Sequence, residues 1–261
     1  MRSAAVRLAR VAAPQYSIVV PLFNEESAVA GTVAALRDWF DARGDSWELL
    51  LIDNASSDAT VQRATPLLDG EKIRLVTNSS NMGKGFSVRR GILEARGDLI
   101  LHCDADCAPS LTSLPKMLKL LEGADLVVGS RLAPGAELGR RQSLPRRFVG
   151  RGFQQCCRAI LAEPTLDLFC GFKLWRAPAA KDVFARLSLD GWTYDAEAIA
   201  MARALGYRIA ETGIVWTDRE GSRLQMAKIL IPVIRELLAA REHVRAEAQR
   251  GSAAPDRAKP Q

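Results

Sequence analysis

The sequence predicts an α/β fold in which a mostly parallel sheet is covered by helices on both faces. Apolar, β-branched runs alternate with helical patterns along the chain. The predicted strands are apolar on both faces, as strands buried between two helix layers must be. A segment long enough for a crossover helix separates each strand from the next, so neighbouring strands can run parallel.

The first half of the chain contains five predicted strands and the helices between them. The strands are expected at 17–22, 47–53, 73–77, 99–103 and 125–129. The helices are expected at 25–40, 59–68, 84–95 and 111–121. Ligands of such sheets bind beyond the carboxyl ends of the strands, so the residues just after each strand are the first candidates for a site.

After Arg131 the alternation gives way to an arginine-rich stretch and then returns. An apolar run is expected at 167–175, a helix at 194–205, a strand at 208–216 and an amphipathic helix at 224–247 that Pro232 bends or restarts. We therefore divide the chain into a basic arm, an α/β domain, this helix and a disordered tail. Their expected bounds are 1–14, 15–223, 224–247 and 248–261.

Composition excludes several classes of protein. The chain has 261 residues, of which 48% are hydrophobic and 25% charged, so disorder throughout is excluded. Its longest uncharged stretch, 11–24, contains two prolines and is shorter than the about 20 apolar residues of a membrane-spanning helix. Arginines interrupt the N-terminus, which therefore lacks the apolar centre of a secretion signal. We expect a cytoplasmic protein whose five cysteines are reduced.

Two aspartates, Asp104 and Asp106, follow the fourth predicted strand. Strand alternation would point both carboxylates the same way. A buried pair of carboxylates repels, whereas a divalent ion satisfies both and keeps positions open for substrate phosphates. Hard oxygen ligands suit Mg²⁺ or Mn²⁺ rather than zinc. The alternative is that the two aspartates only cap the next helix.

The segment 81–85, Asn-Met-Gly-Lys-Gly, opens the third predicted helix. Backbone N–H groups, the positive end of the helix dipole and Lys84 would meet where a phosphate could sit. A plain turn is the alternative, because the full phosphate-cradling pattern of nucleotide triphosphatases is absent.

The stretch 131–158 concentrates positive charge. It holds seven arginines and one acid, Glu137, so its net charge of +6 equals that of the whole protein. Such a cluster suits a phosphate-bearing ligand or an anionic membrane surface. Nucleic acid is a weaker explanation, because the stretch offers two phenylalanines for stacking and no recognised binding motif. A solvated helix face is the remaining alternative.

The polar segments, taken in order, resemble the motif series of family 2 glycosyltransferases. The early motifs are 20–26 (VPLFNEE), 53–60 (DNASSDAT), 81–85 (NMGKG), 104–106 (DAD, a DXD motif) and 129–131 (GSR). Three later segments are similar to the dolichyl-phosphate glucosyltransferase and polyprenyl-phosphate mannosyltransferase branch. These are 170–174 (CGFKL), 192–197 (WTYDAE) and 216–224 (WTDREGSRL). The resemblance covers roughly residues 15 to 230.

This resemblance implies a GT-A fold and a metal-dependent hexosyltransferase. The enzyme would transfer glucose or mannose, with inversion, from a UDP- or GDP-hexose to a polyprenyl phosphate. The donor would contact Pro21, Phe23, Glu25, Asp53, Lys84, Asp104, Ala105, Asp106, Arg131 and Arg223. Within this set Asp53 would bond the base, and Asp104 and Asp106 would hold Mg²⁺ or Mn²⁺.

The sequence departs from the family pattern in three places. Phe23 stands where many relatives carry tyrosine, and Asn54-Ala55 replaces the usual Asp-Gly. The membrane-spanning helices attached to many relatives have no counterpart here. The first two departures concern the choice of nucleotide, and the third concerns the mode of membrane attachment.

A phosphate monoester acceptor needs no strong general base, because its second pKa is about 6. It needs cations that hold two anions together for in-line attack. We assign that task to five arginines: Arg140, Arg141, Arg146, Arg147 and Arg151. The alternative is a soluble enzyme with a saccharide or other hydroxyl acceptor, for which Asp195 would be the catalytic base.

The lipid acceptor has to be met at a membrane surface. We expect peripheral attachment at the cytoplasmic face, through the arginine-rich segment and the final amphipathic helix. A helix that packs on the core or forms a dimer is the alternative for 224–247.

Overall fold

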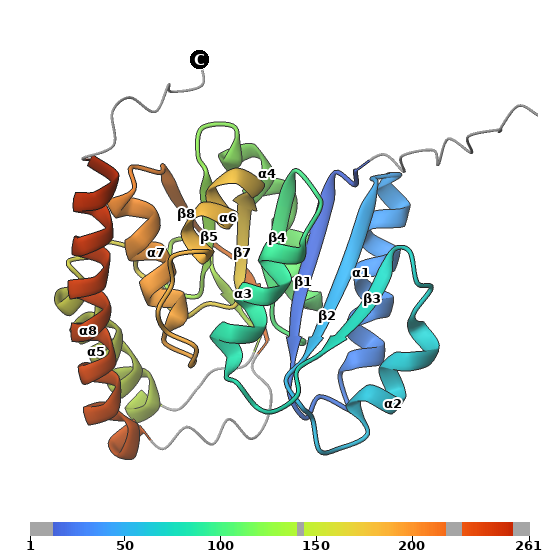
Figure 1. Cartoon of the computed structure of the whole chain (residues 1–261), viewed down its shortest axis with the longest axis horizontal. Helices are drawn as coiled ribbons and strands as arrows, with labels where there is room; N and C mark the ends of the chain where they lie inside the picture. Colours follow the sequence, from blue (N-terminus) through green and yellow to red (C-terminus); the bar gives the residue numbers. More distant parts are fainter. Residues whose placement is uncertain (1–12, 140–143, 218–225, 253–261) are drawn as a thin grey trace, which may run out of the picture.

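The computed structural model of the chain describes residues 13–139, 144–217 and 226–252, and its centre is a seven-stranded sheet (Figure 1). The strands of this sheet, in the order in which they lie, are β3 (Ile73–Thr77), β2 (Trp47–Asp53), β1 (Tyr16–Leu22), β4 (Leu99–Cys103), β7 (Phe172–Arg176), β5 (Leu126–Ser130) and β8 (Ile209–Gly213). A second, two-stranded parallel sheet pairs β6 (Glu137–Leu138) with β9 (Val215–Trp216).

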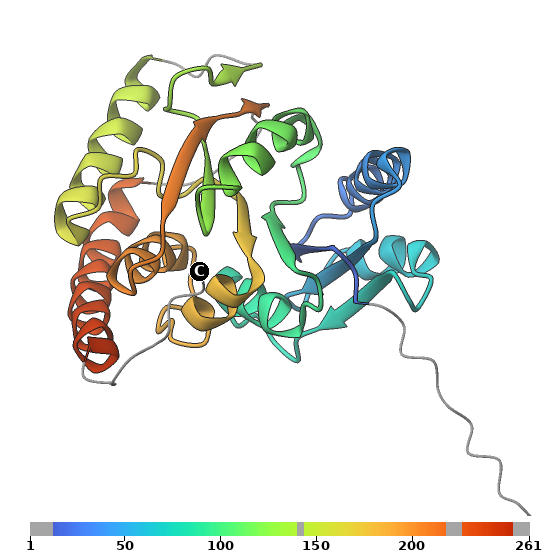
Figure 2. The same cartoon turned by 90° about the horizontal axis from the view of Figure 1, so that it is seen from above.

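Helices cover both faces of the large sheet, as Figure 2 shows from above. One face packs against α1 (Val29–Arg43) and α4 (Leu114–Leu121), and the other against α3 (Lys84–Glu94), α6 (Ala177–Phe184) and α7 (Tyr194–Ala204). The helices α5 (Leu144–Leu161) and α8 (Met226–Ser252) pack against α7. The short α2 (Thr60–Ala64) continues into a 3₁₀ turn at Thr65–Leu67, and a second 3₁₀ segment, Ala108–Ser113, precedes α4.

The side chains of β2 point alternately into the two hydrophobic cores, one on each face of the sheet. Leu49 and Leu51 belong to the core under α1 and α4, while Leu50 and Ile52 belong to the core under α3. All four side chains are fully buried, so the strand contributes to two hydrophobic cores at once. A strand with this pattern is stable only between two helix layers, which is why it reads as a continuous apolar run.

The strand β7 is antiparallel to both of its neighbours, β4 and β5, while the other pairs in the large sheet are parallel. The expectation of a mostly parallel sheet is therefore confirmed. The reversal places the start of β7 beside the end of β4, with Phe172 paired to Cys103. The N–H of Asp104 then donates to the carbonyl of Gly171 over 2.9 Å. Asp104 and Gly171, which are 67 positions apart in sequence, thus meet at the carboxyl edge of the sheet.

Several predicted elements have different bounds, and two of these differences change how segments connect. The first helix begins at Val29 rather than at residue 25, because Asn24 takes a positive φ of 57° and its side chain accepts the N–H of Ser57. This bond ties the first strand tip to the second. The predicted strand 208–216 is divided at Ile214, whose carbonyl accepts from Glu137 in β6, so its last part joins the small sheet.

The last helix, α8, ends at Ser252, beyond residue 247 where we expected it to end, and Pro232 lies inside it. Its buried side chains Val233, Leu237 and Val244 belong to the core that α5 and α7 share. The described apolar face of α8 therefore packs on the domain, as our alternative for this segment expected. The amphipathic character of the whole segment 224–247 stays a prediction, because the side chains before Pro232 lie outside the described part. Within the described ranges, no helix has the length and apolarity needed to cross a bilayer.

Ala55 has a φ of 58°, in the left-handed region that favours glycine. Ala55→Gly should raise the free energy of unfolding by about 0.5–1 kcal/mol, because the strain of the alanine exceeds the added entropy of the glycine. Thermal and urea unfolding would measure it. Ala34→Gly, at an exposed position inside α1, is the control and should lower stability by about 1 kcal/mol. Equal destabilisation by both changes would contradict the strain.

Candidate active site

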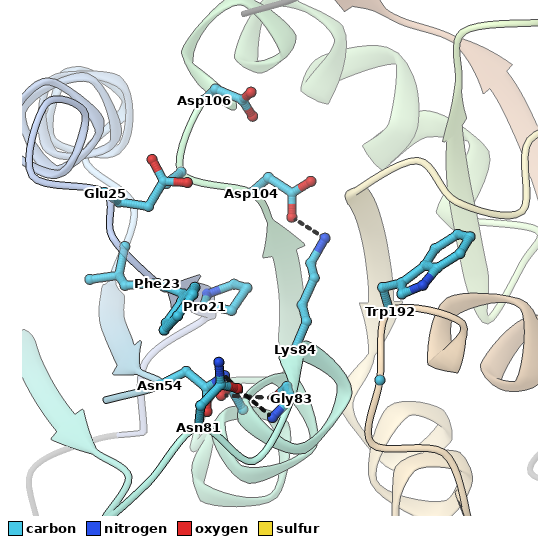
Figure 3. Close-up of a pocket in the computed structure, with 14 residues that line it drawn as sticks. Pro21, Phe23, Glu25, Asn54, Asn81, Gly83, Lys84, Asp104, Asp106 and Trp192 are labelled. Carbon is cyan, nitrogen blue, oxygen red and sulfur yellow. Dashed lines mark hydrogen bonds and ion pairs between the residues drawn. The ribbon is translucent and has the colours of Figure 1, made fainter. Parts of the chain in front are cut away.

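A cavity of about 600 Å³ opens at the carboxyl edge of the large sheet (Figure 3). Its walls come from the end of β1, from the segments that follow β1, β2 and β4, from α3 and the residues just before it, and from the loop before α7. The residues that line it are Pro21, Leu22, Phe23, Glu25, Asn54, Asn81, Gly83, Lys84, Ser87, Asp104, Ala105, Asp106, Gly191 and Trp192. A cavity of this size suits a ligand as large as a nucleotide sugar.

The cavity brings together most of the residues that the sequence assigned to the donor. Those that line it are Pro21, Phe23, Glu25, Lys84, Asp104, Ala105 and Asp106. Asp53 and Arg131 do not line it, and Arg223 lies outside the described residues. In the view of Figure 3, Pro21 and Phe23 lie on one side of Lys84, and Trp192 lies on the other.

The two aspartates stand in the turn after β4, which ends at Cys103. Strand alternation therefore does not orient them, contrary to our reasoning from the sequence, yet both line the cavity. The turn is fixed from below, because the buried hydroxyl of Thr32 donates to the carbonyl of Ala105. Glu25 adds a third carboxylate at the same end of the cavity (Figure 3).

Gly171 packs directly against the carboxylate of Asp104. A Cβ atom at this position would overlap both carboxylate oxygens of Asp104. The glycine therefore leaves the room in which this carboxylate sits, and its carbonyl holds the Asp104 N–H. The sequence placed residue 171 in a family motif but gave no reason for a glycine; the close approach to Asp104 is that reason.

Lys84 reaches Asp104 from the start of α3. Its Nζ lies 2.7 Å from Oδ1 of Asp104, and the two side chains are 33% and 27% exposed. Burial opposes the charge of the lysine, but the carboxylates of Asp104, Asp195 and Asp106 outweigh it and raise the lysine pKa. Lys84 is therefore an ammonium ion across the physiological pH range.

The backbone at the start of α3 differs from our expectation of a phosphate cradle. The N–H groups of Gly85 and Phe86 donate to the carbonyls of Gly191 and Asp190, each over 3.2 Å. Side chains at 83 and 85 would clash with this 189–191 loop, so glycines let the two segments pack closely. These two amides are thus used within the protein, and the lysine side chain is what α3 offers a ligand.

Asn54, rather than Asp53, forms the wall of the cavity at the end of β2. Asp53 is 1% exposed and accepts the N–H of Ser56 over 3.3 Å. The Oδ1 of Asn54 accepts the N–H of Met82 over 2.9 Å, which fixes the orientation of its amide, and its Nδ2 donates to Asn81 over 2.7 Å. Sequence reasoning missed Asn54 as a lining residue, although it had singled out this position as a departure from the family.

Asp195 does not line the cavity and forms a buried ion pair. Its Oδ1 is 2.6 Å from Nζ of Lys173, and the two side chains are 3% and 0% exposed. Lys173 also donates to the carbonyl of Cys170 over 2.6 Å. Nearby, His102 bonds the hydroxyl of Tyr194 over 2.9 Å, and burial and the two lysines lower its pKa, so it is neutral. Lys173, Asp195, His102 and Tyr194 are therefore all buried, and each bonds another group of the protein.

Arg131 also has a protein partner. Its guanidinium makes two parallel hydrogen bonds of 2.8 Å to the buried carboxylate of Asp167, and its N–H adds a third of 3.0 Å. Burial opposes the charge of Asp167, but Arg131 outweighs it and lowers the Asp167 pKa. The guanidinium thus fixes the loop after β5 to the segment before β7 and is engaged away from the cavity.

The arginines assigned to the acceptor are described only in part. Arg140 and Arg141 lie outside the described residues. Arg146 and Arg147 fall within α5, where their side chains are not described, and Arg151 is exposed on the same helix. Their acceptor role stays a prediction.

The oxygen atoms of Asp104 and Asp106 fit Mg²⁺ or Mn²⁺. Within the described part of the chain, no three His, Cys, Asp or Glu residues are grouped so that they could hold a metal ion by themselves. An ion bound here would take its remaining ligands from water and from the donor diphosphate, as Mg²⁺ commonly does. The space that Gly171 leaves beside Asp104 lets this carboxylate face the cavity.

Gly171→Ala should weaken Mn²⁺ binding by about tenfold or more, because the added methyl group displaces the carboxylate of Asp104. Electron paramagnetic resonance of free Mn²⁺ would measure the dissociation constant, and circular dichroism would verify the fold. The matched control is Gly123→Ala, where the added Cβ meets nothing within 4 Å. Unchanged Mn²⁺ affinity in a folded Gly171→Ala protein would contradict the prediction.

Comparisons with known proteins agree with this geometry. A family model described as glycosyl transferase family 2 matches residues 17–184. The chain is 31% identical to a dolichyl-phosphate beta-glucosyltransferase of Mus musculus, over 80% of this chain and 69% of that protein. The similarity to the protein of that name from Dictyostelium discoideum is 29%, over 83% of this chain and 73% of the other.

Solved structures share the fold at low sequence identity. Glucosyl-3-phosphoglycerate synthase from Mycobacterium tuberculosis, in complex with Mn²⁺, UDP-glucose and glycerol 3-phosphate, superimposes with a TM-score of 0.60. The two sequences are 19% identical, and the match covers 89% of this chain and 80% of that one. The GT-A fold expected from the motif series is thereby confirmed. Since the family model spans most of the chain and its motifs line one cavity, the protein belongs to glycosyl transferase family 2.

Proposed function

We propose that this enzyme transfers a hexose, with inversion, from a nucleotide-diphosphate sugar to a polyprenyl phosphate. The names of the relatives, dolichyl-phosphate beta-glucosyltransferases, support a polyprenyl phosphate acceptor and favour glucose as the sugar. The UDP-glucose in a structural neighbour of the same fold supports UDP as the carrier. GDP-mannose is the other donor that the motif series allows.

One observation carries the choice of acceptor, namely the burial of Asp195 in an ion pair with Lys173. A hydroxyl acceptor needs a carboxylate that can take its proton. Asp195 was our candidate for that base, and it neither lines the cavity nor lacks a partner. A phosphate acceptor is already ionised at neutral pH and attacks without such a base.

The lining residues suggest how the donor would be held. Pro21 and Phe23 offer apolar surface to the nucleoside, and Asn54 offers an amide beside it. Lys84 and the two aspartates would meet the diphosphate at the end of the cavity where the carboxylates lie. A divalent ion bound by Asp104 and Asp106 would supply Lewis-acid stabilisation of the leaving diphosphate. Trp192 lies on the other side of Lys84 from Pro21 and Phe23 (Figure 3). The sugar and the acceptor would occupy this side of the cavity.

Attachment to a membrane surface follows from a lipid acceptor. The described apolar face of α8 is buried against α5 and α7, so the arginine-rich stretch 131–158 is the better candidate for the contact. Such a stretch is attracted to anionic lipid headgroups. Flotation with anionic liposomes tests the attachment, and protein that stays entirely at the bottom of the gradient would exclude it.

The decisive experiment incubates the purified protein with UDP-glucose, GDP-mannose and other nucleotide sugars, each with a polyprenyl phosphate. We expect one donor, UDP-glucose, to give a hexosyl lipid that partitions into organic solvent and is identified by mass spectrometry. Product sugar that remains in the aqueous phase would instead indicate a hydroxyl acceptor. Reactions without the polyprenyl phosphate serve as the control.

A further inference from the structure

Three cations, Arg131, Lys173 and Lys84, belong to the segments around the candidate site, and they differ in how they are held. Arg131 pairs with Asp167 and Lys173 pairs with Asp195, whose side chains are 0% and 3% exposed. If either of these two side chains moved away, a buried carboxylate would lose its partner, which is costly in free energy. The third cation, Lys84, differs because, among the described ion pairs, its carboxylate partner is Asp104 itself, the candidate metal ligand.

The Lys84–Asp104 ion pair uses the carboxylate that would have to bind a metal ion. The ammonium lies 2.7 Å from Oδ1 of Asp104, inside the lined cavity. The other oxygen, Oδ2, is the one that packs most closely against Gly171. A divalent cation bound to Oδ1 and the ammonium would share one oxygen atom and repel each other strongly. Metal binding at Oδ1 of Asp104 therefore requires the lysine side chain to move.

The surroundings permit this movement. The backbone of Lys84 is fixed, because its neighbours Gly83 and Gly85 pack against the 189–191 loop. The side chain is 33% exposed and has a flexible four-carbon stem, so its ammonium can swing within the cavity. The two aspartates and Lys84 share this cavity, so a diphosphate bound beside the aspartates would lie within reach of the released ammonium.

We propose that Lys84 is an exchangeable counter-cation that couples metal binding to nucleotide binding. In the ligand-free protein its ammonium neutralises Asp104. When a divalent ion and a nucleoside diphosphate bind together, Lys84 exchanges Asp104 for the diphosphate. The inference rests on the proposed function for the identity of that anion.

This exchange makes the binding of the two ligands cooperative. A metal ion that binds alone must break the Lys84–Asp104 pair and leave the ammonium without an anion. A diphosphate that binds at the same time gives the ammonium a new partner, so each ligand favours the other. In the ligand-free protein the neighbouring carboxylates raise the pKa of Lys84 against the effect of burial, so the side chain that competes with the metal is charged.

The test measures Mn²⁺ binding by electron paramagnetic resonance, with and without UDP, for the full chain and its Lys84→Met variant. We expect the variant to bind Mn²⁺ alone about tenfold more tightly than the original protein, since the competing ammonium is gone. The factor by which UDP strengthens Mn²⁺ binding should fall about tenfold in the variant, because the relief of that competition no longer contributes.

Two further variants make the result specific. Lys84→Arg keeps the positive charge and should bind Mn²⁺ alone as weakly as the original protein, with circular dichroism verifying the fold of each variant. Lys116→Met removes an exposed charge from α4 and should change neither measurement. Lys84→Met with unchanged or weaker affinity for Mn²⁺ alone would overturn the proposal, as would an absence of Mn²⁺ binding in every protein.

The measurement contains no acceptor, so it separates this inference from the proposed function. Coupled binding of Mn²⁺ and UDP that depends on Lys84, together with no hexosyl lipid in the acceptor assay, would reject the lipid acceptor and keep the exchange. Formation of the hexosyl lipid with no effect of Lys84→Met on Mn²⁺ binding would reject the exchange and keep the transferase.

Discussion

Asp104→Asn should lower the turnover of hexose transfer by about a hundredfold or more, and Asp106→Asn should have an effect of the same order. Both carboxylates line the cavity where the leaving diphosphate would sit. Fixed charges that stabilise a leaving group commonly contribute a factor of about 10² to 10³ to the rate. Asparagine keeps the shape of the side chain and removes its charge, so the loss reports electrostatics rather than packing.

Initial rates of hexosyl-lipid formation at saturating donor and acceptor would measure this effect. The matched control is Asp38→Asn, which removes a carboxylate from an exposed position of α1 and should leave the rate unchanged. Mn²⁺ binding should weaken together with turnover in the Asp104 variant. Undiminished activity of the original protein in excess chelator would refute the metal assignment, even if the aspartate variants were inactive.

The strands that position these aspartates were the most predictable part of the molecule. The predicted bounds of β2, β3 and β4 agree with the structure at both ends. These strands are short apolar runs that end at polar residues, and local pattern alone marks such boundaries. The same polar residues mark the edge of the sheet where the cavity opens, which is why Asp104 and Lys84 could be found from the sequence.

The direction of β7 could not be predicted from its residues. A strand that is apolar on both faces fits a parallel or an antiparallel position equally well, and the long connection through α5 allows both. The antiparallel arrangement brings Gly171 against Asp104, so a feature that the sequence does not reveal shapes the candidate metal site.

The partners of the charged residues could not be predicted either. Arg131 pairs with Asp167 and Asp195 pairs with Lys173, at separations of 36 and 22 residues along the chain. Side chains this far apart meet through the tertiary fold, so no local spacing indicates the pairing. Family motifs include Arg131, Lys173 and Asp195, but the structure was needed to distinguish a ligand-binding charge from one that joins two segments.

The buried pair of Asp195 and Lys173 should dominate the stability of this region. Asp195→Leu should lower the free energy of unfolding by about 3–5 kcal/mol, because it leaves the ammonium of Lys173 buried without its partner. For a chain of this size such a loss corresponds to about 10 °C in melting temperature. Urea and thermal unfolding would measure it, with Asp38→Asn again as the exposed control.

The double variant Asp195→Leu with Lys173→Met separates a structural role from a catalytic one. Removing both charges ends the unpaired burial, so the double variant should recover most of the stability that the single change loses. If Asp195 were the base of a hydroxyl acceptor, the double variant would instead be stable and lack all transfer. Stable folding of Asp195→Leu alone, with a turnover that falls a thousandfold, would likewise favour the base. A destabilised single variant and a stable, active double variant would leave the phosphate acceptor, which brings its own negative charge, as the nucleophile.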